Sequence, residues 1–202
     1  MTDNTEKSIL KRIRGSGRGS VFLPNQFTDL GERSAIDKAL SRLAANGTIR
    51  RLARGVYDYP RTHPMMGELS PTIDAVAKAI AGRDQIRLQP TGTYAANLLG
   101  LSEQVPAKVV FLTDGASRTV NVGAMKIQLR QTTPRNMATA GRLSGLLIQA
   151  LRSIGKEHLT AGHIRQLKQR LPASERNALM RDLKLAPVWM QAVFRELTED
   201  EV

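Results

Sequence analysis

The chain has 202 residues and a mass of 22.2 kDa, enough for one large domain or two small ones, each able to bury a core. It contains 30 lysine and arginine residues against 18 aspartate and glutamate residues, so its formal net charge of +12 favours an anionic partner such as nucleic acid. Cysteine is absent, which excludes disulfides and thiolate metal sites.

Before residue 32 the pattern predicts three short elements. Apolar residues fall on one face of Thr5–Arg14, which indicates an amphipathic helix, and glycines then interrupt it. An apolar triplet indicates a strand, and a proline suited to the first turn opens a brief second helix. The predicted ranges are 5–14 for the first helix, 21–23 for the strand and 24–30 for the second helix.

The stretch Glu32–Tyr59 is the most informative part of the sequence. Its first half has apolar residues at a helical period, and Asn46-Gly47 then provides a left-handed helix stop. The residues after this stop are rich in β-branched and aromatic types, which predicts a strand or two. The order helix, strand, helix, helix and basic hairpin is typical of a winged helix-turn-helix module.

Such a module presents the polar face of its third helix and its hairpin to duplex DNA. We expect the first turns of this helix to lie nearest the base edges and its later part to lie nearer the backbone. Guanidinium groups on the hairpin suit phosphate oxygens. The candidate DNA-binding residues are Arg33, Ser34, Asp37, Lys38 and Arg42 on the helix, and Arg50, Arg51 and Arg54 on the hairpin.

Two alternatives remain open for these residues. Lys38 or Arg33 contacts guanine in one interpretation and only phosphate or solvent in the other. The hairpin arginines are backbone contacts or simply a solvated surface, and strand alternation sends only some of them outward.

Prolines and glycines without an apolar period indicate a linker over residues 61–70. The sequence therefore predicts a winged-helix domain over 1–60 and a second domain over 71–202. Within the second domain we expect helices and strands in turn, followed by helices only. The expected helices cover 73–80, 91–99, 143–154, 159–171, 174–183 and 187–197, and the expected strands cover 86–89, 108–113, 118–122 and 124–132, the last two as a hairpin about Gly123. The fold class is thus α+β, with an N-terminal winged helix-turn-helix followed by a small α/β domain with a helical C-terminal region.

The second domain has its own basic region. The range Ser117–Arg176 contains eleven basic residues and two acidic ones. This region could contact DNA, an acidic protein surface or only solvent, and these three alternatives stay open. The candidate residues of this second basic surface are Arg118, Lys126, Arg130, Arg135 and Arg142.

Catalysis finds little support in the sequence. His158 and His163 are five residues apart, so they do not form the i, i+4 pair of a helical metal site. The glycine-rich segment 15–20 lacks the Lys-Ser/Thr end of a phosphate-binding loop, and Ser117 and Asp114 have no evident catalytic partner. We therefore expect a protein that is not an enzyme and needs no cofactor or metal.

Three motifs resemble the AbiEi family of antitoxins from bacterial type IV toxin-antitoxin and abortive-infection systems. They are RRLARGVYDYP at 50–60, QPTGTYAANLLGL at 89–101 and VPAKVVFLTDG at 105–115. The resemblance covers Ser8 to Thr132, and little of it extends beyond Thr133.

The resemblance implies an autorepressor whose winged helix binds the operator of its own operon as double-stranded DNA. It also implies a C-terminal domain that counteracts a nucleotidyltransferase-like toxin. Two other functions stay open: a stand-alone winged-helix regulator whose second domain dimerises or senses a ligand, and a nucleic-acid-modifying enzyme.

The N-terminal segment is charged and lacks the apolar run of a signal peptide. No stretch approaches the roughly 20 apolar residues of a membrane span. We therefore expect a cytoplasmic protein with no membrane partner.

Overall fold

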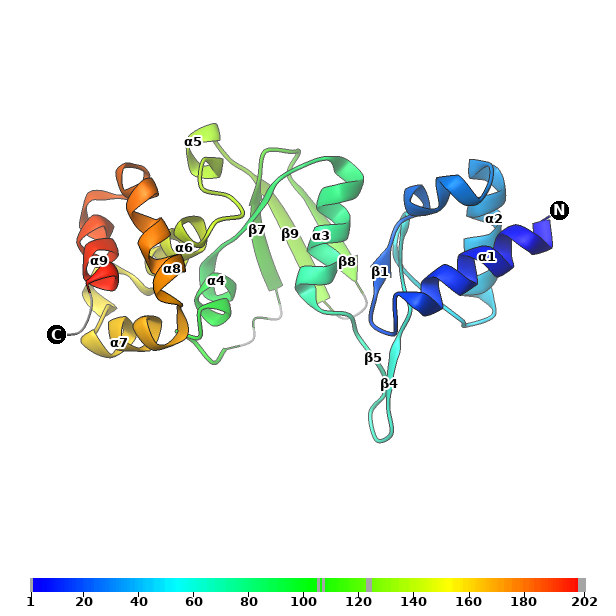
Figure 1. The fold of residues 1–202 in the computed structure, drawn as a ribbon, viewed down its shortest axis with the longest axis horizontal. Coiled ribbons are helices and arrows are strands. Elements are labelled where there is room, and N and C mark those ends of the chain that lie inside the picture. The colour runs from blue at the N-terminus through cyan, green and yellow to red at the C-terminus, as the bar shows by residue number, and fades with distance from the viewer. Residues whose placement is uncertain (1, 105, 107, 123–124, 200–202) are drawn as a thin grey trace. The chain divides into compact units, whose positions relative to one another are not determined.

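The structure is a computed structural model that describes residues 2–104, 106, 108–122 and 125–199. It is an α+β protein in which helices and short strands alternate before a helical C-terminal part (Figure 1). Its residue contacts define two compact units. Unit 1 comprises Met1–Gln85 with Asn121–Ala124, and unit 2 comprises Ile86–Val120 and Met125–Val202. Within the described residues, no helix combines the length and the apolar character needed to cross a membrane.

Unit 1 has a helical core at its N-terminal end. Its helices are α1 (Thr2–Gly15), the 3-10 helix η1 (Pro24–Leu30), α2 (Arg33–Ala45) and α3 (Ile73–Asp84). Helices α1, η1 and α2 contact one another and bury the apolar faces that the sequence predicts, including Ile9, Ile13, Ile36 and Leu40. The predicted boundaries of η1 agree with the structure, because Pro24 lies in its first turn.

A three-stranded antiparallel sheet completes this core. It consists of β1 (Val21–Phe22), β2 (Arg50–Ala53) and β3 (Val56–Asp58) in the order β1-β3-β2. The ring of Phe22 meets Phe27 edge to face at 5.8 Å and stacks on Tyr57 at 6.3 Å. The aromatic residues thus join β1 and β3 to η1, and α3 contacts the same two strands.

The segment predicted as a linker, 61–70, instead contains a hairpin of β4 (Arg61–His63) and β5 (Gly67–Leu69). Three-residue strands are too short to show an alternating pattern. Pro64, which suggested a linker, lies in the turn, and Gly67 begins β5. The hairpin projects from the rest of its unit (Figure 1), and its tip carries Met65 and Met66, which are 90% and 67% exposed. The division between the units falls after Gln85 rather than within this segment.

Unit 2 contains a four-stranded mixed sheet. Its strands are β6 (Leu88–Pro90), β7 (Lys108–Thr113), β8 (Arg118–Val122) and β9 (Met125–Gln131), in the order β6-β7-β9-β8. Strands β7 and β9 are parallel, whereas β6 is antiparallel to β7. The strand expected over 86–89 begins two residues later, and the predicted hairpin centre at Gly123 lies outside the described residues.

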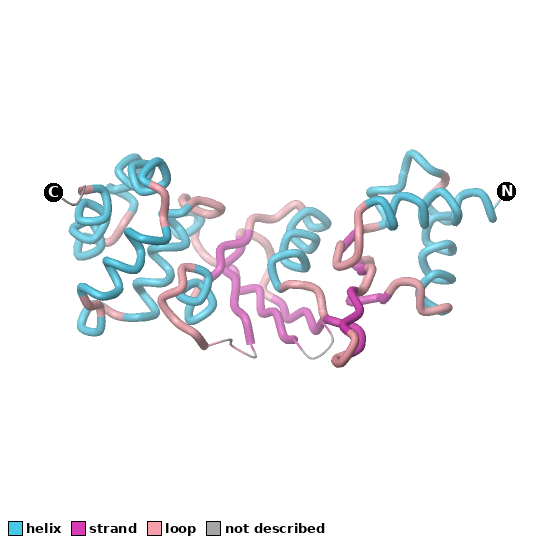
Figure 2. The backbone as a smooth tube through the Cα atoms, turned by 60° about the horizontal axis from the view of Figure 1, so that its bottom comes forward, coloured by secondary structure: helices cyan, strands magenta, loops and turns pink. Residues whose placement is uncertain are grey.

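Helices form the rest of unit 2, and from Leu143 to residue 199 the described part of the chain contains only helices and loops (Figure 2). They bury a second apolar core that includes Leu147, Leu151 and Phe194, with Trp189 packed against it. Helix α4 contacts both α6 and β7, which joins the helical core to the sheet. The helices are α4 (Gly92–Leu98), α5 (Pro134–Met137), α6 (Leu143–Ile154), η2 (Lys156–His158), α7 (Ala161–Arg170), α8 (Ala173–Ala178), η3 (Leu179–Leu185) and α9 (Val188–Thr198).

Candidate nucleic-acid interface

Helix α2 has one buried and one exposed face, as its periodicity predicts. Ile36, Ala39, Leu40 and Leu43 are buried, whereas the side chains of the predicted DNA-binding residues point away from the core. Of these, Arg33, Ser34, Lys38 and Arg42 are exposed and Asp37 is half-buried. The exposed face therefore offers two hydrogen-bonding types to a ligand, cationic donors and a serine hydroxyl.

Two cations on this face are held by carboxylates. Arg33 forms a surface ion pair with Asp37 one turn later, with Nε 2.9 Å from Oδ2. Arg42 forms an ion pair of 2.6 Å with Glu6 of α1, which fixes α2 against the first helix. In the described part of the chain Lys38 makes no ion pair. Exposed ion pairs contribute only about 0 to 1 kcal/mol, so the Arg33 guanidinium remains available to a phosphate.

Arg50 and Arg51, two of the predicted DNA-binding arginines, lie on opposite faces of strand β2. Arg51 pairs with Tyr57 across the sheet, and the Tyr57 ring belongs to the same apolar core as α2. Directly opposed residues of an antiparallel pair project to the same side of the sheet. Arg51 therefore lies on the side that carries the core shared with α1, η1 and α2, and it is exposed. Arg50 pairs with Asp58 and projects to the opposite side.

Arg50 is therefore not available as the phosphate contact that the sequence suggests. Its Nη2 lies 2.6 Å from Oδ2 of Asp58, a side chain with no exposed surface. The same nitrogen donates to the backbone oxygen of Leu69 at 2.7 Å, and Nη1 lies 3.4 Å from Glu68. The hydrogen bond to Asp58 raises the pKa of Arg50, so the guanidinium stays charged and holds β5 against β3.

Arg54 lies at the turn of the same hairpin. Its side chain is exposed, and Gly55 beside it has a φ of 67°, a left-handed conformation that glycine adopts without strain. Nη1 of Arg83, at the end of α3, donates to the Arg54 backbone oxygen at 2.5 Å. The turn is thus anchored through its backbone, and the Arg54 side chain is left for an external ligand.

The packing of α1 against η1 is stabilised by Arg12, an arginine that the sequence analysis does not single out. Arg12 of α1 donates through Nη1 and Nη2 to the two carboxylate oxygens of Asp29, at 2.7 and 2.6 Å, and also to the backbone oxygen of Gln26. The hydrogen bond lowers the pKa of Asp29 below its ordinary value and raises that of Arg12. No sequence signal identifies this pair, because its two members are 17 residues apart.

The second basic surface is only partly assembled. Arg130 lies one residue before the end of β9 and Arg135 lies on α5, and they line adjoining clefts. Lys126 lies near the start of β9, and Arg118 is half-buried on β8. Lys126 and Arg130 share a strand face but are four residues apart, so they do not converge on one ligand atom. Arg152, absent from the predicted surface, lines both clefts.

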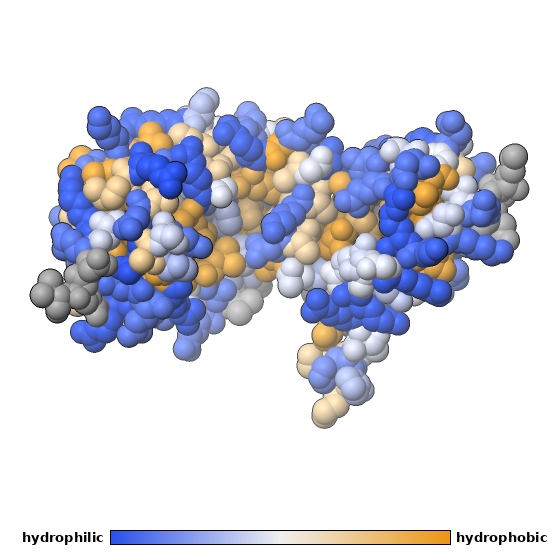
Figure 3. Space-filling view, viewed as in Figure 1, coloured by the Kyte–Doolittle hydropathy of each residue, from blue (hydrophilic) through white to orange (hydrophobic). Residues whose placement is uncertain are grey.

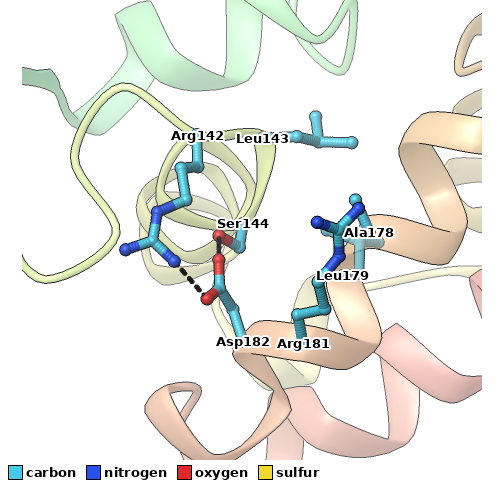
Figure 4. Close-up of a pocket in the computed structure, with 7 residues that line it drawn as sticks. All are labelled: Arg142, Leu143, Ser144, Ala178, Leu179, Arg181 and Asp182. Carbon is cyan, nitrogen blue, oxygen red and sulfur yellow. Dashed lines mark hydrogen bonds and ion pairs between the residues drawn. The ribbon is translucent and has the colours of Figure 1, made fainter.

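Arg142 is an exposed arginine whose guanidinium is paired with a buried carboxylate. Its Nη1 forms an ion pair with Asp182 of η3, and the hydroxyl of Ser144 donates to the other oxygen of the same carboxylate (Figure 4). Ser144 and Asp182 are 2% and 5% exposed. Both carboxylate oxygens are thus occupied, and the cluster attaches the start of α6 to the helices that follow.

The histidines and carboxylates do not combine into a metal site. Within the described residues, no group of three or more histidine, aspartate or glutamate side chains is placed to hold an ion. Nδ1 of His163 lies 3.2 Å from both the backbone nitrogen and the hydroxyl of Thr160 at the start of α7. His163 therefore acts as a helix-capping residue at the start of α7.

Comparison with known proteins adds a family but no named activity. No curated protein matches the chain. Among solved structures, the crystal structure of the RV2827C protein from Mycobacterium tuberculosis is similar with a TM-score of 0.46 and 16% sequence identity, over 99% of this chain and 82% of that one. A family model described as a family of unknown function, DUF6088, matches residues 8–179. The match covers most of both units, and the chain therefore belongs to the DUF6088 family of unknown function.

Proposed function

We propose that unit 1 is a winged helix that binds duplex DNA through α2 and the β2–β3 hairpin. The order α1, β1, η1, α2, β2, β3 and the sheet order β1-β3-β2 support this proposal, because they give a reading helix followed directly by a hairpin wing. One observation carries it: exposed cations lie on the free face of α2 and on the hairpin that follows it. They are Lys38 on α2, Arg51 on the side of the sheet that carries Tyr57, and Arg54 at the turn of the hairpin.

The interface has two parts with different tasks. The first turns of α2, with Arg33, Ser34 and Lys38, enter the major groove, where long donor side chains reach the acceptor edge of guanine. Arg51 and Arg54 contact phosphates, and these contacts set the position of the helix on the duplex without reading its sequence. Arg50 and Arg42 hold the scaffold through their ion pairs.

Salt-dependent binding tests this division of tasks. Fluorescence anisotropy of the full chain with a duplex from its own promoter region gives the affinity at several salt concentrations. The double variant Arg51→Ala/Arg54→Ala loses two phosphate contacts. The negative slope of log K against log salt should therefore become shallower by about 1.8. Lys78→Ala is the matched control, since Lys78 is an exposed cation of unit 1 on neither α2 nor the hairpin. An unchanged slope in the double variant contradicts the proposed interface.

We also propose that the protein is an autorepressor and antitoxin, with unit 2 counteracting a nucleotidyltransferase-like toxin. The support is the resemblance to AbiEi antitoxins in the segments 50–60, 89–101 and 105–115. Co-expression with the adjacent gene tests it: the chain should restore growth if that gene product is toxic. Promoter binding without any such rescue supports the stand-alone regulator instead.

A further inference from the structure

Unit 2 contains a concave polar site where its parallel strands end. Two adjoining depressions share Asn136, Gln149 and Arg152, and we call them together the arginine cleft. Leu112 and Arg130 are opposed residues near the carboxyl ends of β7 and β9, and both line it. Ligands of sheets with parallel strands commonly bind beyond these ends.

The charge of the arginine cleft is entirely positive. Arg130, Arg135 and Arg152 line it, and none of the described lining residues is acidic. Within residues 125–199 none of these three guanidinium groups forms an ion pair, in contrast to Arg142, which pairs with Asp182. Like charges around one depression repel one another, so a bound anion lowers the free energy of this arrangement.

Hydrogen bonds join further polar residues that line the arginine cleft. The Thr91 hydroxyl donates to Oε1 of Gln149 at 3.0 Å, and Nδ2 of Asn136 donates to the Thr132 hydroxyl at 2.9 Å. The Nε2 group of Gln149 and the proton of the Thr132 hydroxyl are thereby left for a ligand. Gln149 is only 5% exposed, so a preformed buried amide lies beside the guanidinium groups.

These donors suit a tetrahedral oxyanion such as a phosphate group. A phosphate offers several oxygens in a tetrahedral arrangement, and guanidinium forks bind such oxygens in pairs. Part of the cleft has a volume of about 420 Å³, within the range of small-ligand sites and larger than one phosphate needs. The competing role for Arg152 is structural, since it lies in the last turn of α6, where a cation stabilises the helix dipole.

We propose that the arginine cleft of unit 2 is a binding site for a phosphate group, held by Arg130, Arg135 and Arg152 with the Gln149 amide as a further donor. The phosphate belongs either to a small phosphorylated molecule or to a nucleic-acid backbone. The site lies within unit 2 and does not depend on DNA binding by unit 1.

Calorimetric titration of the full chain with inorganic pyrophosphate tests the small-molecule source. Saturable binding is expected with one pyrophosphate per chain, and Arg130→Ala/Arg152→Ala should weaken it at least about tenfold. Arg165→Ala is the matched control, because Arg165 is an exposed arginine of unit 2 that does not line the arginine cleft. The double variant Arg51→Ala/Arg54→Ala should bind pyrophosphate as the unaltered chain does, which separates this site from the proposed DNA interface.

A parallel DNA titration tests the nucleic-acid source. Without pyrophosphate binding, a DNA salt slope that falls by about 1.8 in Arg130→Ala/Arg152→Ala and not in Arg165→Ala assigns the phosphate to nucleic acid. If neither probe distinguishes the double variant from the Arg165 control, the proposal is overturned.

Loss of folding does not obscure this test. Ser153→Glu is a second variant, in which an exposed residue of the cleft gains a carboxylate while every arginine is kept. The new charge should abolish phosphate binding, with a melting temperature close to that of the unaltered chain. Full phosphate binding by a folded Ser153→Glu chain also overturns the proposal.

Discussion

Arg50 and Asp58 form a two-point ion pair across β2 and β3. Nη2 lies 2.6 Å from Oδ2 and Nε lies 3.1 Å from Oδ1, while Asp58 is completely buried. A buried carboxylate without a partner is costly, so the arginine at this position belongs to the fold. The neighbouring Arg51, one residue away, has its side chain on the other face of the strand and in solvent.

Arg50→Ala should destabilise the protein strongly, whereas Arg51→Ala should not. Removing Arg50 leaves Asp58 buried and uncompensated, and we expect the free energy of unfolding to fall by about 3 to 5 kcal/mol. Arg51→Ala should change it by less than about 0.5 kcal/mol, since its side chain is on the surface. Urea denaturation of both variants measures the difference, and equal losses would contradict the structural role of Arg50.

Lys38→Ala should reduce sequence discrimination by unit 1. If Lys38 contacts a guanine edge, the variant loses about 1 to 3 kcal/mol of binding free energy at one base position and tolerates other bases there. Binding to a panel of duplexes with single base changes measures this loss. A uniform weakening over the whole panel would make Lys38 a phosphate contact.

Substitution of alanine for glycine should have opposite effects on stability at positions 145 and 82. A Cβ at Gly145 would overlap the backbone oxygen of Thr139 and crowd the Gln89 amide, so Gly145→Ala should displace the start of α6 and destabilise the protein by about 1 to 3 kcal/mol. Gly82 in α3 has no neighbour within 4 Å of such a Cβ, so Gly82→Ala should stabilise the protein by about 0.5 to 1 kcal/mol. Thermal denaturation of both variants checks the pair, and a destabilised Gly82→Ala would refute the packing argument.

Arg87 should control the pKa of Asp114. Its Nε donates to Oδ2 at 2.8 Å and its backbone N–H donates to Oδ1 at 2.8 Å, and the side-chain bond is the larger cause of a pKa below the ordinary 3.8. Arg87→Ala should therefore raise this pKa, though not fully, because the backbone bond remains. Carboxyl NMR titration measures the change.

The lowered pKa of Asp114 also fixes the sign of its effect on stability. The unfolded carboxyl binds a proton more readily than the folded one, so the contribution of Asp114 is complete above its ordinary pKa. It is lost as the pH falls through the lowered value in the folded protein. Arg87→Ala should weaken this acid-dependent part of unfolding, and an identical acid profile in both proteins would contradict it.

The sequence predicts most helices and longer strands because their apolar periods are local. Helix α6 and strand β7 have the predicted bounds, since each carries a full pattern of buried residues. The β4–β5 hairpin and the four-residue α5 were missed because such short elements contain no complete period. Their existence depends on contacts with residues that are distant in the sequence.

The sequence predicts which residues of the candidate sites are exposed better than it predicts which of them are already held in ion pairs. Periodicity correctly placed Lys38 on the exposed face of α2, because the opposite face supplies its core. It does not reveal that Arg50 and Arg142 have carboxylate partners, since Asp182 lies 40 residues after Arg142. Arg152 was not singled out for the same reason: the cleft that it shares with Arg130 forms only when α6 packs beside the sheet.

The two methionines at the tip of the β4–β5 hairpin are the most exposed methionines of the described residues. Figure 3 shows apolar colour at the end of the projecting hairpin, where the Met65 and Met66 side chains are largely open to solvent. Peroxide reaches exposed thioethers first, whereas Met137 and Met190 are completely enclosed. Sulfoxide formation should therefore begin at Met65 and Met66, which makes the apolar tip polar, while the sulfur atoms of Met137 and Met190 stay reduced.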